Sequence, residues 1–203
     1  LEQKGTLNWR EALHFGTQIC KALEHAHSRG IIHRDIKPAN VIIRKSDGMP
    51  FVLDFGVARE IKESMTRVTG APSSGTVRYM SPEQLRGEDP TRLQDVYSFA
   101  VMAYECLKGD PPFFRGFIEI QIRHERPKPL PMGINMRDGI MRALSKTPSA
   151  RPKSCAAVLD IPRQNQSPWQ KLPRGVRLAV FGLAGVLVLA FLLWLHVMAR
   201  DAG

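Results

Sequence analysis

The most informative residues of this 203-residue chain are His33-Arg34-Asp35-Ile36-Lys37-Pro38-Ala39-Asn40 and, a short distance later, Asp54-Phe55-Gly56. Two apolar runs, Val41-Ile42-Ile43 and Phe51-Val52-Leu53, lie between them. Both runs are too brief for helices and rich in β-branched residues, so we predict two short strands. The Asp47-Gly48 pair predicts the turn that joins them. The two polar stretches are therefore expected to form neighbouring loops.

The two stretches resemble the catalytic loop and the metal-binding turn of protein kinases. Several fixed residue types within eight positions, followed by a second motif, make the match specific, whereas Asp-Phe-Gly alone would be weak. The resemblance spans residues 6–159. It implies a mainly α-helical large lobe with short β-hairpins, which transfers the γ-phosphoryl group of Mg-ATP to serine and threonine hydroxyls of proteins.

Phosphoryl transfer depends on positioning and on compensating the charge that spreads over the oxygens of the transferred group. Asp35 is the predicted base that faces the attacking hydroxyl, and Lys37 is predicted to reach the phosphate as a point charge. Lysine at this position is similar to the serine/threonine form of the family. Mg²⁺ prefers oxygen ligands and retains several waters, so Asn40 and Asp54 are the predicted magnesium ligands. The alternative for Asn40, a turn residue, fits its spacing from Asp35 less well.

Two further residues near the loop take their roles from the resemblance. It implies that His33 packs beneath Phe55 and does not act as an acid or base. It also implies that Ile42 lies under the adenine ring of ATP, a role compatible with a position in a strand.

Gly75-Thr76 and Tyr79-Met80-Ser81-Pro82-Glu83 resemble the end of the family's activation segment, with Ser81 where alanine is commoner. The resemblance implies that Thr76 forms a hydrogen bond near Asp35 and Lys37, another trait of serine/threonine kinases. Thr76 is therefore included among the predicted catalytic residues.

Three charged residues are expected to hold the lobe together. Glu83 and Arg151 are similar to the family's buried ion pair, which joins the activation segment to the base of the lobe. Asp95 is similar to the residue that grips the backbone of the catalytic loop.

Arg34, directly before the predicted base, suggests control by phosphorylation, because an arginine there could pair with a phosphate on the following loop. Residues 58–75 are predicted to form that long loop. Its candidate hydroxyls are those of Ser64, Thr66, Thr69, Ser73 and Ser74, with Thr69, Ser73 and Ser74 slightly favoured by position. For each one, an unmodified hydroxyl remains the simpler expectation.

Helices are predicted on both sides of the loop. Asn8 and Glu11 form a capping-box pattern, apolar residues follow at helical spacing, and Gly30 marks the end. The adjacent Ile31-Ile32 pair is predicted to be a strand. A second helix, Leu93–Lys108, is apolar nearly all round and is expected at the centre of the core. Shorter helices are expected at 136–144 and 154–159, and the helix between 113 and 131 is expected to be abbreviated.

The glycine-rich loop, the strand lysine and its glutamate partner of the family's small lobe have no counterpart in the chain. We expect a fragment of a complete kinase. The alternative is a non-catalytic, membrane-tethered half-kinase that acts as an interaction scaffold, and reading the coding region upstream of Leu1 separates the two. A lipid or small-molecule kinase is a weaker possibility, because the Gly75-Thr76 and Ser81-Pro82-Glu83 motifs favour protein substrates.

The composition adds few functional signals to the first 159 residues. The formal charge is +10, but the basic residues are scattered and not interleaved with aromatics, so no nucleic acid is expected as a partner. The three cysteines, Cys20, Cys106 and Cys155, indicate neither a disulfide framework nor a zinc site. This fits a reducing compartment, and each cysteine is predicted to be a small buried apolar residue.

The C-terminal part predicts a membrane anchor. Residues 178–198 contain no Asp, Glu, Lys or Arg, and a helix of this length spans about 30 Å, the thickness of a hydrocarbon core. We expect residues 1–159 to form the lobe, 160–177 a basic linker, 178–198 a transmembrane helix and 199–203 a short tail. The basic residues before the span place the lobe in the cytoplasm, on a cell membrane crossed once. The oligomeric state is left open.

Overall fold

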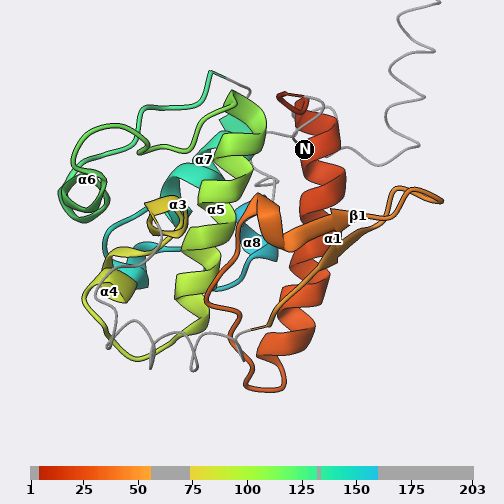
Figure 1. The fold of residues 1–203 in the computed structure, drawn as a ribbon, viewed down its shortest axis with the longest axis horizontal. Coiled ribbons are helices and arrows are strands. Elements are labelled where there is room, and N and C mark those ends of the chain that lie inside the picture. The colour runs from red at the N-terminus through yellow and green to blue at the C-terminus, as the bar shows by residue number, and fades with distance from the viewer. Residues whose placement is uncertain (1–4, 56–73, 132–133, 160–203) are drawn as a thin grey trace, which may run out of the picture. The chain divides into compact units, whose positions relative to one another are not determined.

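A computed structural model describes residues 5–55, 74–131 and 134–159 of the chain (Figure 1). The elements in chain order are α1 (Trp9–His27), η1 (Pro38–Asn40), β1 (Val41–Ile43), β2 (Pro50–Val52), α3 (Ser74–Val77), α4 (Pro82–Leu85), α5 (Arg92–Lys108), α6 (Ile118–His124), α7 (Ile134–Ala143), η2 (Pro148–Ala150) and α8 (Ala156–Leu159). The described part is mainly helical and contains one two-stranded antiparallel sheet. The predicted fold class is confirmed to this extent.

Helix α1 begins at the predicted capping box. The side-chain oxygen of Asn8 accepts hydrogen bonds from the backbone N–H groups of Arg10 and Glu11, both at 3.0 Å, and the Asn8 N–H donates to the Glu11 carboxylate at 3.1 Å. Gly30, at φ 74°, follows the helix in a conformation that favours glycine. Both boundaries of this helix are therefore explained by local sequence.

The predicted strand at Ile31-Ile32 is wrong, because these residues pair with no strand in the described part of the chain. The Ile31 N–H instead donates to the Ala26 carbonyl at 3.0 Å, which closes the turn after α1. Two β-branched residues form a strand only where a neighbouring strand accepts their hydrogen bonds.

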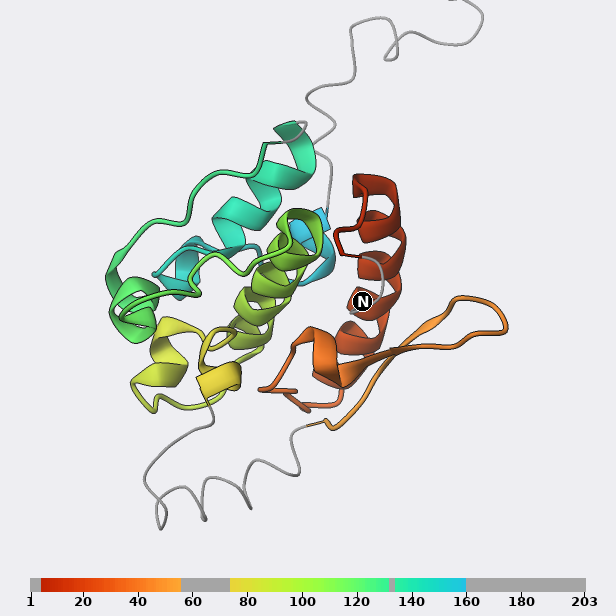
Figure 2. The ribbon, with the colours of Figure 1, turned by 45° about the horizontal axis from the view of Figure 1, so that its top comes forward.

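Helix α5 forms the centre of the fold. Every residue from Gln94 to Met102 is buried, and Gly109 ends the helix at φ 95°. Figures 1 and 2 show α5 between α1 and α7, and α1 and α7 both pack against it. The prediction of a central, apolar helix is confirmed.

Helices α7 and α8 approach so closely that Gly139 is required between them. A Cβ atom added at Gly139 would lie 2.0 Å from the carbonyl oxygen of Val158. The helices at 136–144 and 154–159 are confirmed with small changes in their ends. The contact between α7 and α8 thus depends on glycine at position 139, because every other residue type has a Cβ atom.

Replacing Gly139 with alanine is expected to lower the free energy of unfolding by about 1–3 kcal/mol or more, because a backbone carbonyl cannot move aside as a side-chain end can. Urea denaturation followed by circular dichroism measures the loss. Gly16→Ala is an intermediate comparison, since its Cβ would meet the Leu159 side chain at 3.0 Å, and Gly75→Ala is a control with open space. A Gly139→Ala loss no larger than that of Gly75→Ala contradicts the prediction.

Two short helices, α3 and α4, lie outside the helix predictions because four residues carry no clear periodicity. Helix α6 corresponds to the abbreviated helix expected between residues 113 and 131. Only Ser74 and Gly75 of the predicted loop at 58–75 are described, and both belong to α3, so the loop prediction is wrong there. Residues 56–73 lie outside the described part.

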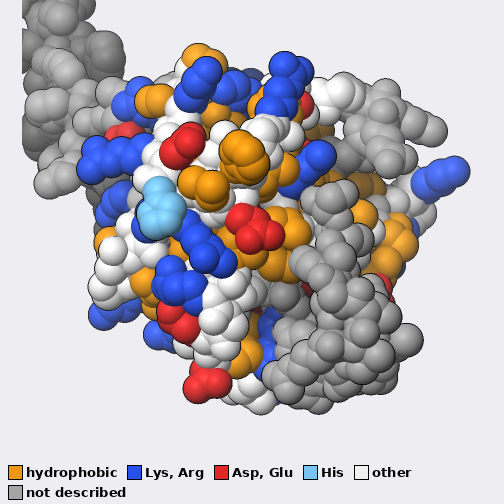
Figure 3. All heavy atoms as spheres, turned by 60° about the vertical axis from the view of Figure 1, so that its left-hand side comes forward, with side chains coloured by type: hydrophobic (Ala, Val, Ile, Leu, Met, Phe, Trp, Pro, Cys, Tyr) orange, Lys and Arg blue, Asp and Glu red, His pale blue; other side chains and the backbone are white. Residues whose placement is uncertain are grey.

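Helix α6 is the only helix between residues 113 and 131 and has seven residues. On the face that carries it, hydrophobic side chains lie among basic and acidic ones (Figure 3). Phe117, 80% exposed, and Ile120, 54% exposed, are the most exposed large apolar side chains of the described residues. The surface around α6 thus combines apolar, basic and acidic side chains.

The three cysteines are free, with Cys20 and Cys155 buried and Cys106 half-buried. Burial raises the pKa of each thiol, that of Cys106 to about 11, so none is a thiolate at neutral pH. The prediction that they are small buried apolar residues is confirmed for Cys20 and Cys155, whereas Cys106 is only partly buried.

In the described part of the chain, no helix combines the length and the apolar character that crossing a membrane requires. The predicted linker at 160–177, the span at 178–198 and the tail at 199–203 lie outside that part. The membrane anchor stays a prediction.

Candidate active site

The hairpin places the two predicted loops side by side. Val41 pairs with Val52 and Ile43 with Pro50, so Asn40, before β1, and Leu53, after β2, meet at one end of the sheet. The Leu53 N–H donates to the Asn40 carbonyl at 2.9 Å. The loop that carries Asp35 therefore ends, and the turn that carries Asp54 begins, at the same end of the sheet.

Four predicted site residues form one hydrogen-bonded cluster. Lys37 Nζ donates to Asp35 Oδ2 at 2.8 Å and to Thr76 Oγ1 at 3.1 Å. Asn40 Nδ2 donates to the Asp35 carbonyl at 2.6 Å and to Asp35 Oδ2 at 3.1 Å. The Asp35 and Lys37 side chains are 23% and 18% exposed. The carboxylate of Asp35 is thus held from two sides.

The second oxygen of the same carboxylate is not held. Asp35 Oδ1 is buried and has no hydrogen-bond partner among the described residues. A buried acceptor without a donor costs about 1–3 kcal/mol, and more when it is charged. Oδ1 is therefore the place in this cluster where an incoming hydroxyl group would be favoured.

Asp54 lies next to the cluster but does not join its hydrogen bonds. Its side chain is exposed, and within the described residues it forms no hydrogen bond with Asp35 or Asn40. Asp54 (φ 55°) and Arg34 (φ 67°) are the non-glycine residues with positive φ in the described part. Strained backbone of this kind clusters at functional sites, and here it marks both predicted loops.

The His33 side chain contacts both the loop that carries Asp35 and the segment around Asp54. Its ring is fully buried and 4.9 Å from the ring of Phe55. His33 Nε2–H donates to the Leu53 carbonyl at 2.8 Å, and Nδ1 accepts the Asp35 N–H at 3.2 Å. Because both ring nitrogens are used, the imidazole is the neutral Nε2–H tautomer and has no free nitrogen for acid–base chemistry.

Asp95, a residue of α5, holds the backbone of the loop that carries Asp35. The side chain is fully buried; Oδ2 accepts the His33 N–H at 2.8 Å and Oδ1 accepts the Arg34 N–H at 2.9 Å. Oδ2 also lies 2.7 Å from His27 Nε2. Sequence reasoning missed His27, since a lone histidine 68 residues from its partner carries no local signal.

Glu83 and Arg151 form a buried, bidentate ion pair. Arg151 Nη1 and Nη2 donate to the two carboxylate oxygens of Glu83 at 2.6 and 2.8 Å, and the side chains are 0% and 3% exposed for Arg151 and Glu83. Burial alone would raise the pKa of Glu83, but the hydrogen bonds and charge of Arg151 outweigh it and lower this pKa below its usual value. The carboxylate is therefore ionised at neutral pH.

Gln84 is a second residue that sequence reasoning missed. Its Nε2 donates to the Arg34 carbonyl at 2.8 Å, which ties α4 to the loop that carries Asp35. Ser81 caps α4, because its hydroxyl accepts the Gln84 N–H while the Gln84 side chain accepts the Ser81 N–H. The pattern Ser-Pro-Glu-Gln is a capping box that could have predicted this helix.

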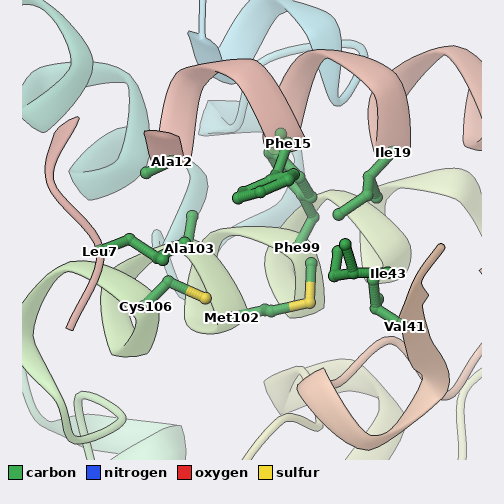
Figure 4. Close-up of a pocket in the computed structure, with 11 residues that line it drawn as sticks. Leu7, Ala12, Phe15, Ile19, Val41, Ile43, Phe99, Met102, Ala103 and Cys106 are labelled. Carbon is green, nitrogen blue, oxygen red and sulfur yellow. The ribbon is translucent and has the colours of Figure 1, made fainter. Parts of the chain in front are cut away.

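One face of strand β1 lines an apolar cavity. Val41 and Ile43 extend into a cavity of about 210 Å³ between α1, β1 and α5 (Figure 4). Ile42, between them, points to the other face, as side chains alternate along a strand, and is 52% exposed. The residue predicted to lie under adenine thus offers an open aliphatic surface on the face opposite the cavity.

The regulatory predictions fall mostly outside the described part. Ser64, Thr66, Thr69 and Ser73 lie beyond it, and Ser74 is the first residue of α3. The backbone of Arg34 is held by Asp95 and Gln84. The pairing of Arg34 with a phosphate stays a prediction.

The donor set fits magnesium better than a transition metal. The described residues contain no group of three or more His, Cys, Asp or Glu side chains that could hold a metal. Mg²⁺ needs only one or two protein oxygens beside its waters. Asn40 directs its Nδ2 to Asp35, so its amide oxygen remains as a ligand atom. The exposed Asp54 directly follows Leu53, whose N–H donates to the Asn40 carbonyl.

A helical lobe built around a buried central helix, with two strained loops at the end of a small hairpin, is typical of the large lobe of protein kinases. The sequence profile described as "Protein kinase domain" matches residues 1–161. The chain belongs to the protein kinase family.

Curated relatives agree with this assignment. Serine/threonine-protein kinase PknB of Mycolicibacterium smegmatis is 37% identical over 161 residues, 75% of this chain and 26% of the relative. PknB of Mycobacterium leprae is 35% identical over 160 residues, with the same shares. Serine/threonine-protein kinase PknA of Mycobacterium tuberculosis is 35% identical over 183 residues, 83% of this chain and 42% of the relative. The chain spans about a quarter of the length of the PknB relatives.

Proposed function

We propose that this chain is the large catalytic lobe of a membrane-anchored protein serine/threonine kinase, which transfers the γ-phosphoryl group of Mg-ATP to hydroxyls of protein substrates. The observation that carries the proposal is the cluster of Asp35, Lys37, Asn40 and Thr76, in which one oxygen of the Asp35 carboxylate is held and the other has no donor among the residues that the structure describes. A non-catalytic scaffold would not need this arrangement.

Asp35 orients the acceptor hydroxyl and takes its proton. Lys37 and Asn40 both donate to Oδ2 of Asp35, which leaves Oδ1 to accept the hydrogen bond of the substrate hydroxyl. Such positioning of a general base contributes about 10²–10⁴-fold to a rate. The ammonium group of Lys37 compensates the charge on the transferred phosphoryl group.

Asn40 and Asp54 hold magnesium, and Ile42 lies against the adenine ring. When bound, the metal compensates negative charge on the phosphate oxygens. The chain's own contribution is to place an amide oxygen and a carboxylate at the same end of the hairpin as Asp35.

Serine and threonine are favoured over tyrosine as acceptors. Lys37 donates to both Asp35 and Thr76, so the lysine and threonine that mark the serine/threonine form of the family act together. The similar proteins PknB and PknA are named serine/threonine-protein kinases, and protein substrates are proposed for this chain by analogy.

The membrane attachment is proposed from sequence. Residues 178–198 form an uncharged stretch long enough to span the hydrocarbon core, and the basic residues Arg163, Lys171, Arg174 and Arg177 precede it. The lobe would then face the cytoplasm.

The test is to incubate the complete natural protein with radiolabelled ATP and magnesium, and to identify the labelled amino acids of a protein substrate. We expect phosphoserine and phosphothreonine, and no label when EDTA removes the metal. Label on tyrosine alone, on lipid, or on no acceptor with magnesium present would contradict the proposal.

A further inference from the structure

We propose that Lys146 is a positioning residue: its ammonium group fixes the C-terminal end of α6, and α6 in turn packs on residues 76–80, the segment that carries Thr76. The inference deepens the proposed function, on which the importance of Thr76 rests. The contacts that carry it do not depend on catalysis.

The Lys146 side chain caps α6 from a distant part of the chain. Its Nζ donates to the carbonyl oxygens of Gln121 at 3.2 Å and of Ile122 at 2.6 Å. Both residues lie in the last turn of the helix, where backbone carbonyls lack partners within the helix and a cation is favourable. The same Nζ lies 4.4 Å from the centroid of the Phe113 ring. Three contacts thus converge on one ammonium group.

The charge of Lys146 argues against a simple packing role. Burial and the nearby charge of Arg151 lower the pKa of Lys146 to about 8, although the charge of Glu125 acts in the opposite direction. The amine is still mostly protonated at neutral pH, so a cation is held here at a cost. An apolar side chain of similar length would avoid that cost and could still lie against Phe113. The two hydrogen bonds to α6 are the contribution that it could not supply.

Helix α6 packs on the segment that follows Thr76. Ile122, whose carbonyl Lys146 binds, is fully buried. It belongs to a buried apolar cluster that joins α6 to this segment and consists of Val77, Met80, Phe113 and Ile122. Thr76 directly precedes the cluster and accepts the hydrogen bond from Lys37 at 3.1 Å. The position of α6 therefore bears on the position of Thr76.

The backbone from which Lys146 reaches α6 is itself held. Arg151 donates to the Ser145 carbonyl at 2.8 Å and to the Lys146 carbonyl at 3.4 Å. Arg151 also binds Glu83 of α4, and α4 and α6 lie side by side in Figures 1 and 2. One segment, residues 145–151, thus anchors both helices, with Arg151 binding α4 and Lys146 binding α6.

Three variants separate the cap from the packing. Lys146→Met keeps the length of the side chain but has no donor, whereas Lys146→Arg keeps both the charge and the donors. Lys108→Met is the matched control, because Lys108 Nζ lies 5.3 Å from the Tyr104 ring centroid and donates to the Tyr104 hydroxyl at 3.0 Å, without a contact to α6.

Hydrogen exchange of the complete natural protein, followed by mass spectrometry, reports on residues 118–125 and 76–80, with residues 96–104 in α5 as the reference for global opening. Both reporting segments contain hydrogen-bonded amides, such as those of Glu125 and Met80. We expect exchange in both to be about tenfold faster in Lys146→Met relative to the reference, as loss of a charge-assisted hydrogen bond predicts. Lys146→Arg and Lys108→Met should exchange at rates near those of the unaltered protein.

Four outcomes would overturn the proposal: equal acceleration in all three segments, no acceleration, acceleration at 118–125 without acceleration at 76–80, or an arginine variant that behaves like the methionine variant. A measurement on the unaltered protein covers variants that fail to fold. Exchange at 118–125 and at 76–80 should show the same dependence on low urea concentrations, because the two segments open as one unit. Separate openings would also overturn the proposal.

Activity supplies an additional readout. In the complete kinase, Lys146→Met should lower kcat with little change in KM for ATP, Lys146→Arg should restore it, and Lys108→Met should leave it unchanged. A methionine variant with unaltered kcat would contradict the link from α6 to Thr76. If no kinase activity exists, hydrogen exchange still decides the role of Lys146 separately from the proposed function.

Discussion

Asp35→Asn in the complete kinase is expected to lower phosphotransfer to a protein substrate by about 10²–10⁴-fold while leaving the fold intact. Asparagine has the size and shape of aspartate, and its amide oxygen can still accept the bond from Lys37, which now reaches Oδ2 at 2.8 Å. What is lost is the negative charge and the basic oxygen that receives the proton. Transfer of radiolabelled phosphate at saturating ATP measures the rate, and thermal unfolding checks the fold.

The matched control is Asp47→Asn, the same substitution in the turn of the hairpin. The Asp47 side chain is 41% exposed and pairs with Arg44 rather than with the cluster. We expect a rate close to that of the unaltered kinase. Retained turnover in Asp35→Asn, or an equal loss in both variants, would refute the assignment of Asp35 as the base.

Arg151→Met is expected to lower the free energy of unfolding by about 3–5 kcal/mol, because it leaves the Glu83 carboxylate buried without its partner. Glu83 is 3% exposed, and Arg151 supplies both of its short ion-pair hydrogen bonds. Arg151 also donates to the Leu93 and Ser145 carbonyls, so several elements lose a common anchor. Urea denaturation followed by circular dichroism measures the loss.

Two controls identify the buried charge as the cause. Adding Glu83→Gln to Arg151→Met removes the stranded charge and is expected to recover part of the stability. Arg137→Met breaks an exposed ion pair, in which the side chain of Arg137 is 35% exposed and that of Asp138 is 50% exposed. This variant is expected to lower the free energy of unfolding by about 0–1 kcal/mol. A loss in Arg151→Met no larger than in Arg137→Met would contradict the prediction.

The pair also sets a pH dependence with a definite sign. Arg151 lowers the pKa of Glu83 in the folded state. The ionised form therefore contributes stability that is fully present above the ordinary glutamate pKa of about 4.3, and this contribution is lost as the pH falls through the lower folded value. The difference in stability between the unaltered chain and Arg151→Met should accordingly shrink in acid.

Local sequence was enough for the long helices and for the hairpin. The capping box at Asn8 and the glycine after Lys108 define helix ends through contacts within a few residues. The strands of the hairpin are joined by a short turn, so their pairing is also local. The strand predicted at Ile31-Ile32 failed because a strand requires a partner, and that requirement is not written in the two residues themselves.

In the candidate site, too, local sequence predicted some residues and tertiary packing decided the others. Asp35, Lys37 and Asn40 lie within six positions, so their sequence pattern alone already placed them in one loop. Thr76, Asp95 and the Glu83–Arg151 pair were expected through the family resemblance. Their contacts depend on how α3 and α5 pack against the loop before β1, and on how α4 packs against the segment that carries Arg151. His27 and Gln84 emerged only from the tertiary structure. A hydrogen bond across 50 or more residues leaves no periodicity or spacing in the sequence, because it exists only once the helices that carry its two ends have packed.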